Sequence, residues 1–194
     1  MTGLLDGVRI VEFSYYGSGP LAGQILGDTG ADVIKVEPTT GDPWRRNLPI
    51  LPNEGFAFLP VNRSKRGIGL DLKHPGSVEI LERLIRTADV VLTNYRRAAL
   101  EKLGIDYPAL SKLNPRLVYV SIAMADDPPG APSTPGYDQT AQAASGLMAA
   151  DEKLTADGLP LAVGSAPADF ASGFVGAFAV SSGLAHVHRT GEGT

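Results

Sequence analysis

A short unit near the amino terminus constrains the fold more than any other feature. Residues 8–13 form an apolar run typical of a buried strand, and residues 15–19 form a turn that contains two glycines. Pro20 suits the first position of a helix over residues 20–30, because its missing N–H costs no hydrogen bond there. Residues 33–37 supply a second apolar strand. Strand, glycine turn, helix and strand in this order open a doubly wound parallel sheet.

The same alternation continues along the chain. Further strands are predicted over residues 67–72, 89–93 and 117–122, and further helices from Pro75 and over residues 98–103, 137–149 and 169–188. Proline-rich residues 42–60 and 125–136 are expected to be irregular. The predicted fold class is therefore α/β, a Rossmann-like sheet of about five or six parallel strands. No repeat or linker demands a second domain, so residues 1–194 are assigned to one domain.

Composition limits the partners. The net charge of −4 provides no general basic field for nucleic acid, and the chain has no cysteine. The three histidines are scattered, so no metal site is expected. Residues 170–187 are uncharged and long enough to cross a bilayer, but they include three serines and a histidine. A helix buried in protein is expected instead, in a cytoplasmic protein without a signal peptide or a membrane partner.

The first turn matches a dinucleotide-binding pattern. Residues 17–22 read GSGPLA, as in G-x-G-x-x-G/A, and Glu37 stands 20 residues after Gly17, where an NAD-binding acid would hold the ribose. Short glycine patterns also arise by chance. The turn therefore leaves open NAD, another ligand or a merely tight turn.

Two cationic stretches flank predicted strands. Residues 62–67 contain Arg63, Lys65 and Arg66, which could contact phosphates or form a solvated strand edge. Residues 94–97 read NYRR at the carboxyl end of a strand, where ligands of open α/β sheets collect. The alternative is that Asn94 caps a helix with a charged surface.

Asp169 opens the last predicted helix, in the stretch PADFASG. An aspartate in this position is most often a helix cap. It would also suit a nucleophile, because N–H groups at a helix start hold an oxyanion and small neighbours leave room for an acyl chain. The local sequence does not separate these interpretations.

Taken in order, these fragments resemble the class III CoA-transferases, a family that includes formyl-CoA and carnitine CoA-transferases and alpha-methylacyl-CoA racemase. The resemblance includes LDGVRIVEF at 5–13, GDTGADVIKVE at 27–37 and NRSKR at 62–66. It continues through residues 19–20, 70–73, 88–91, 103–104, 113–119, 136–138, 145–148, 169 and 189–193. It covers essentially the whole chain.

The resemblance implies a CoA-binding domain in place of an NAD-binding one. It implies that Asp169 attacks the acyl-CoA thioester, forming a mixed anhydride and then an aspartyl thioester. The positions that match the family's CoA site are Gly17, Ser18, Leu70, Lys73, Asn94 and Lys102, and Tyr137 matches a position beside the acyl group. The cofactor implied is CoA or acyl-CoA as substrate, without a metal.

Some positions depart from the family pattern. Pro38 stands where relatives often carry arginine, and residues 93–98 and 123–128 differ from the usual stretches, which leaves acyl specificity open. Tyr137 stands where the racemases carry a catalytic histidine, and a phenol is a poor base at neutral pH, so a transferase is expected over a racemase.

Family members continue into a second domain, and their subunits interlock as dimers. This chain is therefore predicted to correspond to their N-terminal half, without that second domain. It is expected to form a homo-oligomer or a complex with a chain supplying the C-terminal half, and not to turn over alone. A non-catalytic CoA-binding fragment remains an alternative. A further alternative, that the protein is an NAD-dependent oxidoreductase, rests on the glycine turn alone.

Overall fold

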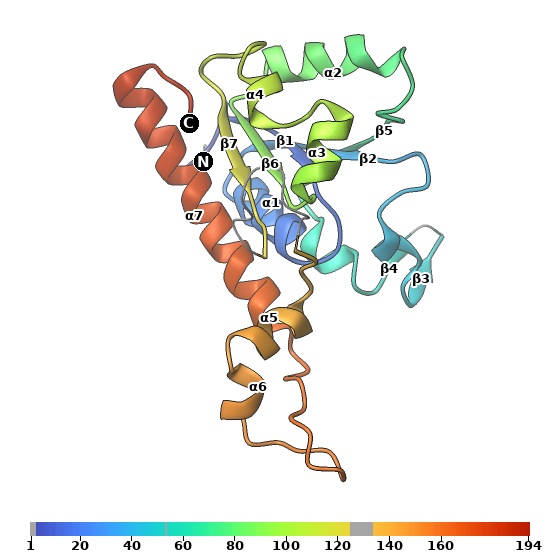
Figure 1. Cartoon of the computed structure of the whole chain (residues 1–194). Helices are drawn as coiled ribbons and strands as arrows, with labels where there is room; N and C mark the ends of the chain where they lie inside the picture. Colours follow the sequence, from blue (N-terminus) through green and yellow to red (C-terminus); the bar gives the residue numbers. More distant parts are fainter. Residues whose placement is uncertain (1–2, 53, 125–133) are drawn as a thin grey trace.

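The computed structural model describes residues 3–52, 54–124 and 134–194 and has an α/β architecture built on one main sheet (Figure 1). Its parallel strands are β1 (Arg9–Phe13), β2 (Asp32–Glu37), β5 (Lys65–Gly69), β6 (Val90–Thr93) and β7 (Val118–Ser121). Their spatial order is β5-β2-β1-β6-β7. The predicted fold class is confirmed. The winding reverses between β1 and β6, and sheets of this kind bind ligands beyond the carboxyl ends of the strands at such a point.

Helices cover both faces of the sheet (Figure 1). One face carries α2 (Ser77–Arg86), α3 (Arg97–Leu103) and α4 (Tyr107–Leu110), and the other carries α1 (Ser18–Asp28) and α7 (Pro167–Thr190). Successive strand residues point to opposite faces. In β1, Val11 and Phe13 therefore join the first core cluster, whereas Ile10 joins the second.

The long helix α7 is apolar and long enough to cross a membrane by length and composition alone. It packs one face against α1 and β7, where small residues permit close approach. A Cβ added at Gly173 would lie 2.8 Å from Leu21 Cδ2, and one added at Gly176 would lie 2.7 Å from Ile122 Cδ1. These contacts explain the apolar sequence of α7, because one face of the helix packs into the core of the α/β fold.

The structure differs locally from the sequence-based expectation. Residues 42–60 contain the 3-10 helices η1 (Pro43–Arg46) and η2 (Leu59–Val61) and a hairpin of β3 (Pro49–Leu51) and β4 (Glu54–Gly55). The strand predicted over 67–72 is β5, which begins earlier because the charged side chain of Lys65 is satisfied inside the protein. Of the proline-rich loop predicted at 125–136, residues 125–133 lie outside the described residues.

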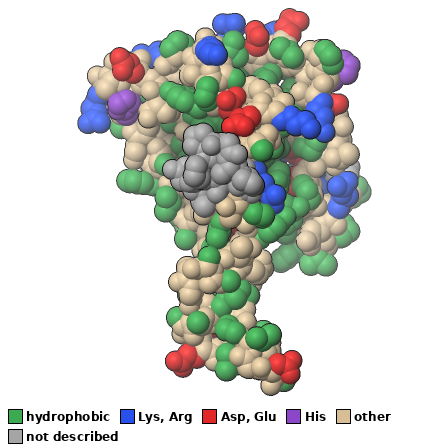
Figure 2. Space-filling view, viewed as in Figure 1, with side chains coloured by type: hydrophobic (Ala, Val, Ile, Leu, Met, Phe, Trp, Pro, Cys, Tyr) green, Lys and Arg blue, Asp and Glu red, His purple; other side chains and the backbone are tan. Residues whose placement is uncertain are grey.

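The helical stretch predicted over 137–149 is two helices, α5 (Asp138–Ala144) and α6 (Leu147–Ala150). Gly146 separates them in a left-handed conformation with φ +79°. Residues 145–166, called the arm below, form a narrow projection from the body of the protein (Figure 2). Four leucines of the arm are exposed: Leu147, Leu154, Leu159 and Leu161.

Candidate active site

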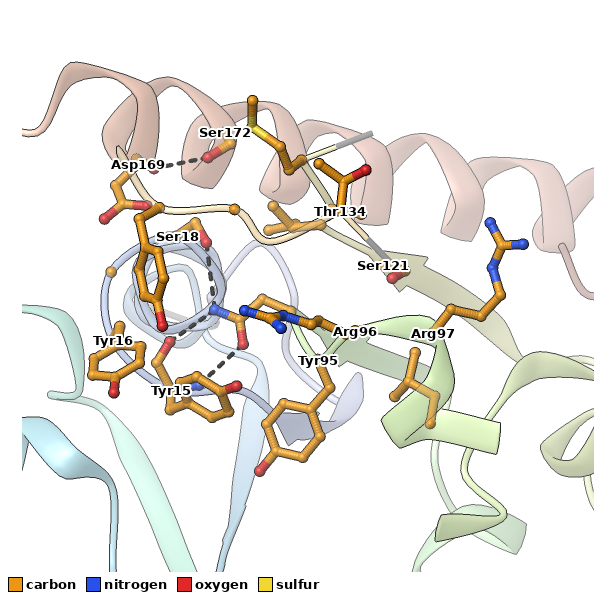
Figure 3. A pocket seen from close by; sticks show the side chains of 18 of the residues that line it. Tyr15, Tyr16, Ser18, Tyr95, Arg96, Arg97, Ser121, Thr134, Asp169 and Ser172 are labelled. Atoms are coloured by element: carbon orange, nitrogen blue, oxygen red, sulfur yellow. Dashed lines mark hydrogen bonds between the residues drawn. The ribbon is translucent and has the colours of Figure 1, made fainter. Parts of the chain in front are cut away.

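A cavity of about 930 Å³ lies beyond the carboxyl ends of β1, β6 and β7, where the topology predicts a ligand (Figure 3). Its volume falls in the range of small-molecule sites. Side chains from the turn after β1, from the start of α3, from β7 and from the first turn of α7 converge on it. They include Tyr15, Tyr16, Ser18, Asn94, Tyr95, Arg96, Arg97, Tyr119, Ser121, Tyr137, Asp138, Asp169 and Ser172.

The turn between β1 and α1 brings backbone to the cavity wall. Tyr16 has φ +64°, a left-handed conformation that a bulky residue keeps only when its surroundings enforce it. The side chain of Asn94 supplies part of that constraint. Its Oδ1 accepts from the Tyr15 N–H at 3.1 Å, and its Nδ2 donates to the Tyr15 carbonyl at 2.7 Å. Asn94 therefore fixes the turn, whatever it contributes to a ligand.

Asp169 lies half-buried on the first turn of α7 (Figure 3). Its carboxylate lies over Gly17. A Cβ added at Gly17 would lie 2.5 Å from Asp169 Oδ2 and 2.9 Å from its Cγ. Burial, and then the charge of Asp138, raises the pKa of Asp169 above its ordinary value. A carboxylate with a raised pKa beside a cavity is a candidate reactive group.

Asp169 does not cap its own helix. The N-cap residue of α7 is Ala166, which offers no capping side chain. Instead the buried carboxylate of Asp138 accepts from the N–H groups of Ala168 at 2.8 Å and Asp169 at 3.1 Å. Asp138 also bonds to the Gln142 side chain, which in turn exchanges hydrogen bonds with the backbone of Val163. The carboxylate of Asp169 is thus released from the capping role that its position suggested.

Asp138 is the main site residue that sequence reasoning missed. The sequence predicts that this helix begins at Asp169, whereas in the structure it begins at Pro167 with Ala166 as the N-cap. Because alanine has no capping side chain, the first N–H groups need an acceptor from elsewhere in the chain. The capping also corrects the idea that the start of α7 holds an oxyanion. The N–H groups of Ala168 and Asp169 donate to Asp138, and that of Phe170 donates to the Ala166 carbonyl at 3.1 Å.

Aromatic rings line the cavity near Asp169. The Tyr15 ring lies 4.8 Å from that of Tyr16 and 5.0 Å from that of Tyr95, and Tyr16 lies 6.4 Å from Tyr137. Burial raises the pKa of both Tyr15 and Tyr95, so these phenols stay neutral near neutral pH. They give this part of the cavity a largely apolar wall.

The structure brings together five of the eight residues that the family resemblance singled out. Gly17, Ser18, Asn94, Tyr137 and Asp169 line the cavity. Leu70, Lys73 and Lys102 are outside its lining: Leu70 is buried in the core cluster under α2, whereas Lys73 and Lys102 lie on the protein surface. All three follow the carboxyl ends of strands or the start of α3, and a CoA contact by them stays a prediction.

Glu37 does not fit the role of an NAD-binding acid. Its two carboxylate oxygens accept from Arg45 Nε at 2.7 Å and Nη2 at 2.6 Å, and Oε2 also accepts from the Asp42 N–H at 2.8 Å. A ribose would have to displace this bidentate pair. Burial tends to raise the pKa of Glu37, but the hydrogen bonds from Arg45 and from the Asp42 N–H hold it below its ordinary value.

The cationic stretch at 62–67 is internally paired and is not a solvated edge throughout. Arg63 pairs with Asp28 at 2.6 Å, and Arg66 pairs with Asp32 at 2.7 Å. Lys65 is buried against Glu12 at 2.8 Å. These pairings favour a structural role for this stretch. Among the described residues no group of three or more acidic, histidine or cysteine side chains could hold a metal ion.

The fold and the site define a class of protein. It is a Rossmann-like domain with a ligand cavity at the switch point of its sheet, and a carboxylate with a raised pKa stands at the edge of that cavity. Residues 5–194 match the family described as CoA-transferase family III, and the chain belongs to that family.

Curated relatives support the assignment. The chain is 41% identical to a succinate–glutarate CoA-transferase of Agrobacterium fabrum, over 97% of this chain and 49% of the relative. It is 37% identical to a formyl-CoA:oxalate CoA-transferase of Rhodopseudomonas palustris, over 100% of this chain and 45% of the relative. The chain thus spans about half the length of the curated relatives it matches.

Solved structures agree. The protein Rv3272 of Mycobacterium tuberculosis superposes with a TM-score of 0.88 at 37% identity, over 100% of this chain and 54% of that one. A CAIB/BAIF family protein of Brucella suis superposes with a TM-score of 0.86 at 36% identity, over 100% and 52%.

Proposed function

We propose that this chain supplies the CoA-binding domain and the nucleophile of an enzyme that moves CoA between an acyl-CoA thioester and a carboxylic acid. The observation that carries the proposal is the position of Asp169. Its carboxylate is half-buried, has a raised pKa and stands at the edge of the cavity of a family III CoA-transferase fold.

The proposed reaction runs through Asp169 in balanced steps. One carboxylate oxygen of Asp169 attacks the thioester carbonyl carbon and the C–S bond breaks. CoA leaves as a thiolate, and Asp169 and the acyl group form a mixed anhydride. The thiolate then attacks the Asp169 carbonyl carbon, and the acyl group leaves as a free carboxylate. The acceptor carboxylate attacks the carbonyl carbon of the resulting aspartyl thioester, the C–S bond breaks, and a second mixed anhydride forms as the thiolate leaves. The thiolate finally attacks the acceptor's carbonyl carbon, and the Asp169 carboxylate leaves. This last step restores the Asp169 carboxylate, and no external proton or electron is consumed.

The surroundings of Asp169 favour the first step. As a free carboxylate it is partly buried and lies near the charge of Asp138, and both effects oppose ionisation. Acylation makes Asp169 neutral and removes both penalties, so part of the ground-state free energy is recovered on the way to the anhydride. Asp138 remains bonded to the start of α7 and is available to hold Asp169 in place throughout.

The remainder of the cavity suits the other parts of acyl-CoA. Tyr16 and Tyr137 offer an apolar surface beside the reacting carboxylate. Arg96 and Arg97 line the same cavity and would complement phosphate charge. Leu70, Lys73 and Lys102 would contact a nucleotide portion that extends beyond it.

Relatives suggest acids to test first. Those with similar sequences are named for succinate, glutarate and oxalate, so dicarboxylic acids are the natural first acceptors. A racemase is the second candidate of the same family, but Tyr137 offers a phenol where that reaction needs an imidazole base. An NAD-dependent activity is disfavoured by the Arg45–Glu37 pair.

The enzyme's environment and partners are part of the proposal. Four apolar side chains of the first half of α7 are exposed, namely Phe170, Phe174, Val175 and Phe178. Contiguous exposed apolar surface marks an interface. Because the relatives are about twice as long, we propose that a further domain or a second copy covers this face in a cytoplasmic oligomer, and that the present chain alone binds CoA without turnover.

Trapping of the intermediate tests the proposal. The chain would be incubated with succinyl-CoA or oxalyl-CoA, with and without a C-terminal half from a relative, and then treated with hydroxylamine. Peptide mass spectrometry should find the hydroxamate on Asp169 alone, and Asp169→Ala should abolish it. Labelling at another carboxylate, or normal turnover by Asp169→Ala, would overturn the assignment.

A further inference from the structure

Four charged side chains form a buried network beneath the turn that carries Gly17. Glu12 comes from β1, Lys35 from β2, Lys65 from β5 and Asp42 from the loop after β2. Glu12 and Lys35 are direct partners in the parallel register. Their exposed fractions are 0% for Glu12 and 1% for Lys35 and Asp42. None of the four lines the cavity.

The network is electrically balanced. Lys35 Nζ lies 3.1 Å from both Glu12 Oε1 and Asp42 Oδ2, and Lys65 Nζ lies 2.8 Å from Glu12 Oε2. Burial alone would raise the pKa of Glu12, but the charges of Lys65 and Lys35 outweigh it and hold that pKa below its ordinary value. Each charge therefore has a direct neighbour of opposite sign, although burial lowers the pKa of Lys65 to about 8 against the charge of Glu12.

Both lysines also hold the backbone at the two ends of the turn. Lys35 Nζ donates to the Ser14 carbonyl at 2.7 Å, and Lys65 Nζ donates to the Pro20 carbonyl at 2.8 Å. The Ser14 hydroxyl donates to Glu12 Oε1 at 2.7 Å. Helix α1 closes over the group at Gly23, where an added Cβ would overlap the Glu12 carboxylate.

The segment between these two anchors is the one that meets Asp169. It contains Tyr16 in its left-handed conformation and Gly17 against the Asp169 carboxylate. A buried ion network is often no more stable than apolar side chains of the same volume, so stability alone is a weak reason for four buried charges. Apolar side chains would, however, leave the Ser14 and Pro20 carbonyls without their lysine donors, so that the turn would keep its bonds to the Asn94 side chain but lose those to the two lysines.

We propose that Lys35 and Lys65 are positioning residues, which fix the Ser14–Pro20 turn from below and thereby hold Gly17 against the carboxylate of Asp169. The inference rests on the proposed function only in taking Asp169 as the group that must be placed. The two lysines act through the turn and contact neither CoA nor the acyl group.

A charge-balanced double variant tests the inference. Lys35→Met with Asp42→Asn removes one positive and one negative charge, and with them the contacts of Lys35 to Glu12 and Asp42. It leaves Glu12 paired with Lys65 and keeps an amide oxygen where Asp42 Oδ1 accepts from the Trp44 N–H. The pKa of Asp169 would be followed in the intact chain by carbon-13 NMR of labelled aspartate, without substrate. We expect it to fall toward its ordinary value, since a displaced turn uncovers the carboxylate, and we expect CoA to bind about tenfold more weakly.

A matched control lies on the same two strands. Asp32→Asn with Arg66→Gln removes the surface pair between β2 and β5, together with the charge that faces Arg9, and should leave both values unchanged. A folded Lys35→Met/Asp42→Asn chain with the wild-type Asp169 pKa would overturn the inference. If that variant does not fold, Lys65→Met with Glu12→Gln repeats the test from the other lysine, and failure of both to fold would show a purely structural network. Absence of CoA binding in the wild type would count against the proposed function, whereas the NMR measurement would still decide this inference.

Discussion

The carboxylate of Asp169 lies against the Cα of Gly17, so closely that a Cβ at Gly17 would come within 2.5 Å of Oδ2. The two residues open different helices, α7 and α1, which pack side by side on one face of the sheet. Glycine at this position therefore lets the two helix starts approach and places the carboxylate at the cavity.

Gly17→Ala should displace the Asp169 carboxylate without unfolding the chain. Its φ of −94° is accessible to alanine, so the steric contact with Asp169 is the main effect. A misplacement of this kind costs about a hundredfold in the rate of a reaction that depends on alignment. We expect that loss in hydroxylamine-trapped acylation. Gly164→Ala, where an added Cβ meets nothing within 4 Å, should react normally.

Asp169→Asn should stabilise the chain at pH 7. The pKa of Asp169 is raised in the folded state by burial and by Asp138, so folding weakens its ionisation and stability falls as pH rises between the unfolded and folded pKa values. Above the folded pKa the penalty is complete. The stabilisation by asparagine should therefore be largest above the raised pKa of Asp169, decline as pH falls below that value, and be absent below the unfolded pKa. Urea unfolding measures it, and exposed Asp157→Asn should give no such gain. A loss of stability at pH 7 in Asp169→Asn would contradict the stated cause.

Asp138→Ala should destabilise the chain more than Asp138→Asn. Alanine leaves the N–H groups of Ala168 and Asp169 without their acceptor, at a cost of about 1–3 kcal/mol in the free energy of unfolding. Asparagine keeps an acceptor but removes the charge, so it should lower the pKa of Asp169. Denaturant unfolding tests the first effect, and NMR titration tests the second. An unchanged Asp169 pKa in Asp138→Asn would show that burial alone raises it.

CoA should raise the melting temperature and NAD should not. A ligand at a hundredfold excess over its Kd adds about 2.7 kcal/mol to the free energy of unfolding. NAD would have to compete with Arg45 for Glu37. Arg45→Ala removes the partner of the Glu37 carboxylate and serves as the control. Stabilisation of this variant by NAD would show that the Arg45–Glu37 pair is what excludes NAD. Stabilisation of the wild-type chain by NAD alone would contradict the CoA assignment.

Phe174→Ser with Phe178→Ser should reduce self-association or capture of a complementary half. Both rings lie on the outer face of α7, with exposed fractions of 62% and 72%, so their removal should leave the core intact. Light scattering measures the mass, and circular dichroism checks the fold. Val78→Ser on α2, half exposed on the opposite layer, should leave the mass unchanged. Equal mass for the double variant and the wild type would place the interface elsewhere.

The sequence by itself determined the parallel α/β fold. The apolar runs that became β1, β2, β6 and β7, the helix start at Pro20 and the end of α3 at Gly104 are local patterns, because each depends on side-chain period and backbone conformation within a few residues. The ordered fragments also led to the family and singled out Asp169. The start of β5 was not predicted, because a charged residue such as Lys65 is unusual inside a strand. No local pattern shows that the buried carboxylate of Glu12 pairs with it.

Only the tertiary structure decided which of these residues meet. Asp138 caps α7 from the start of α5, and Asn94, which follows β6, holds Tyr15, which follows β1. Arg45 binds the Glu37 carboxylate, which the sequence had offered as an NAD-binding acid. The first two contacts join segments 30 and 79 residues apart that the packing of the sheet and helices brings together, and the third depends on how the loop after β2 folds back. The partner and the burial of a side chain depend on how distant segments pack. The spacing of apolar residues that favours a strand or a helix depends only on neighbouring residues.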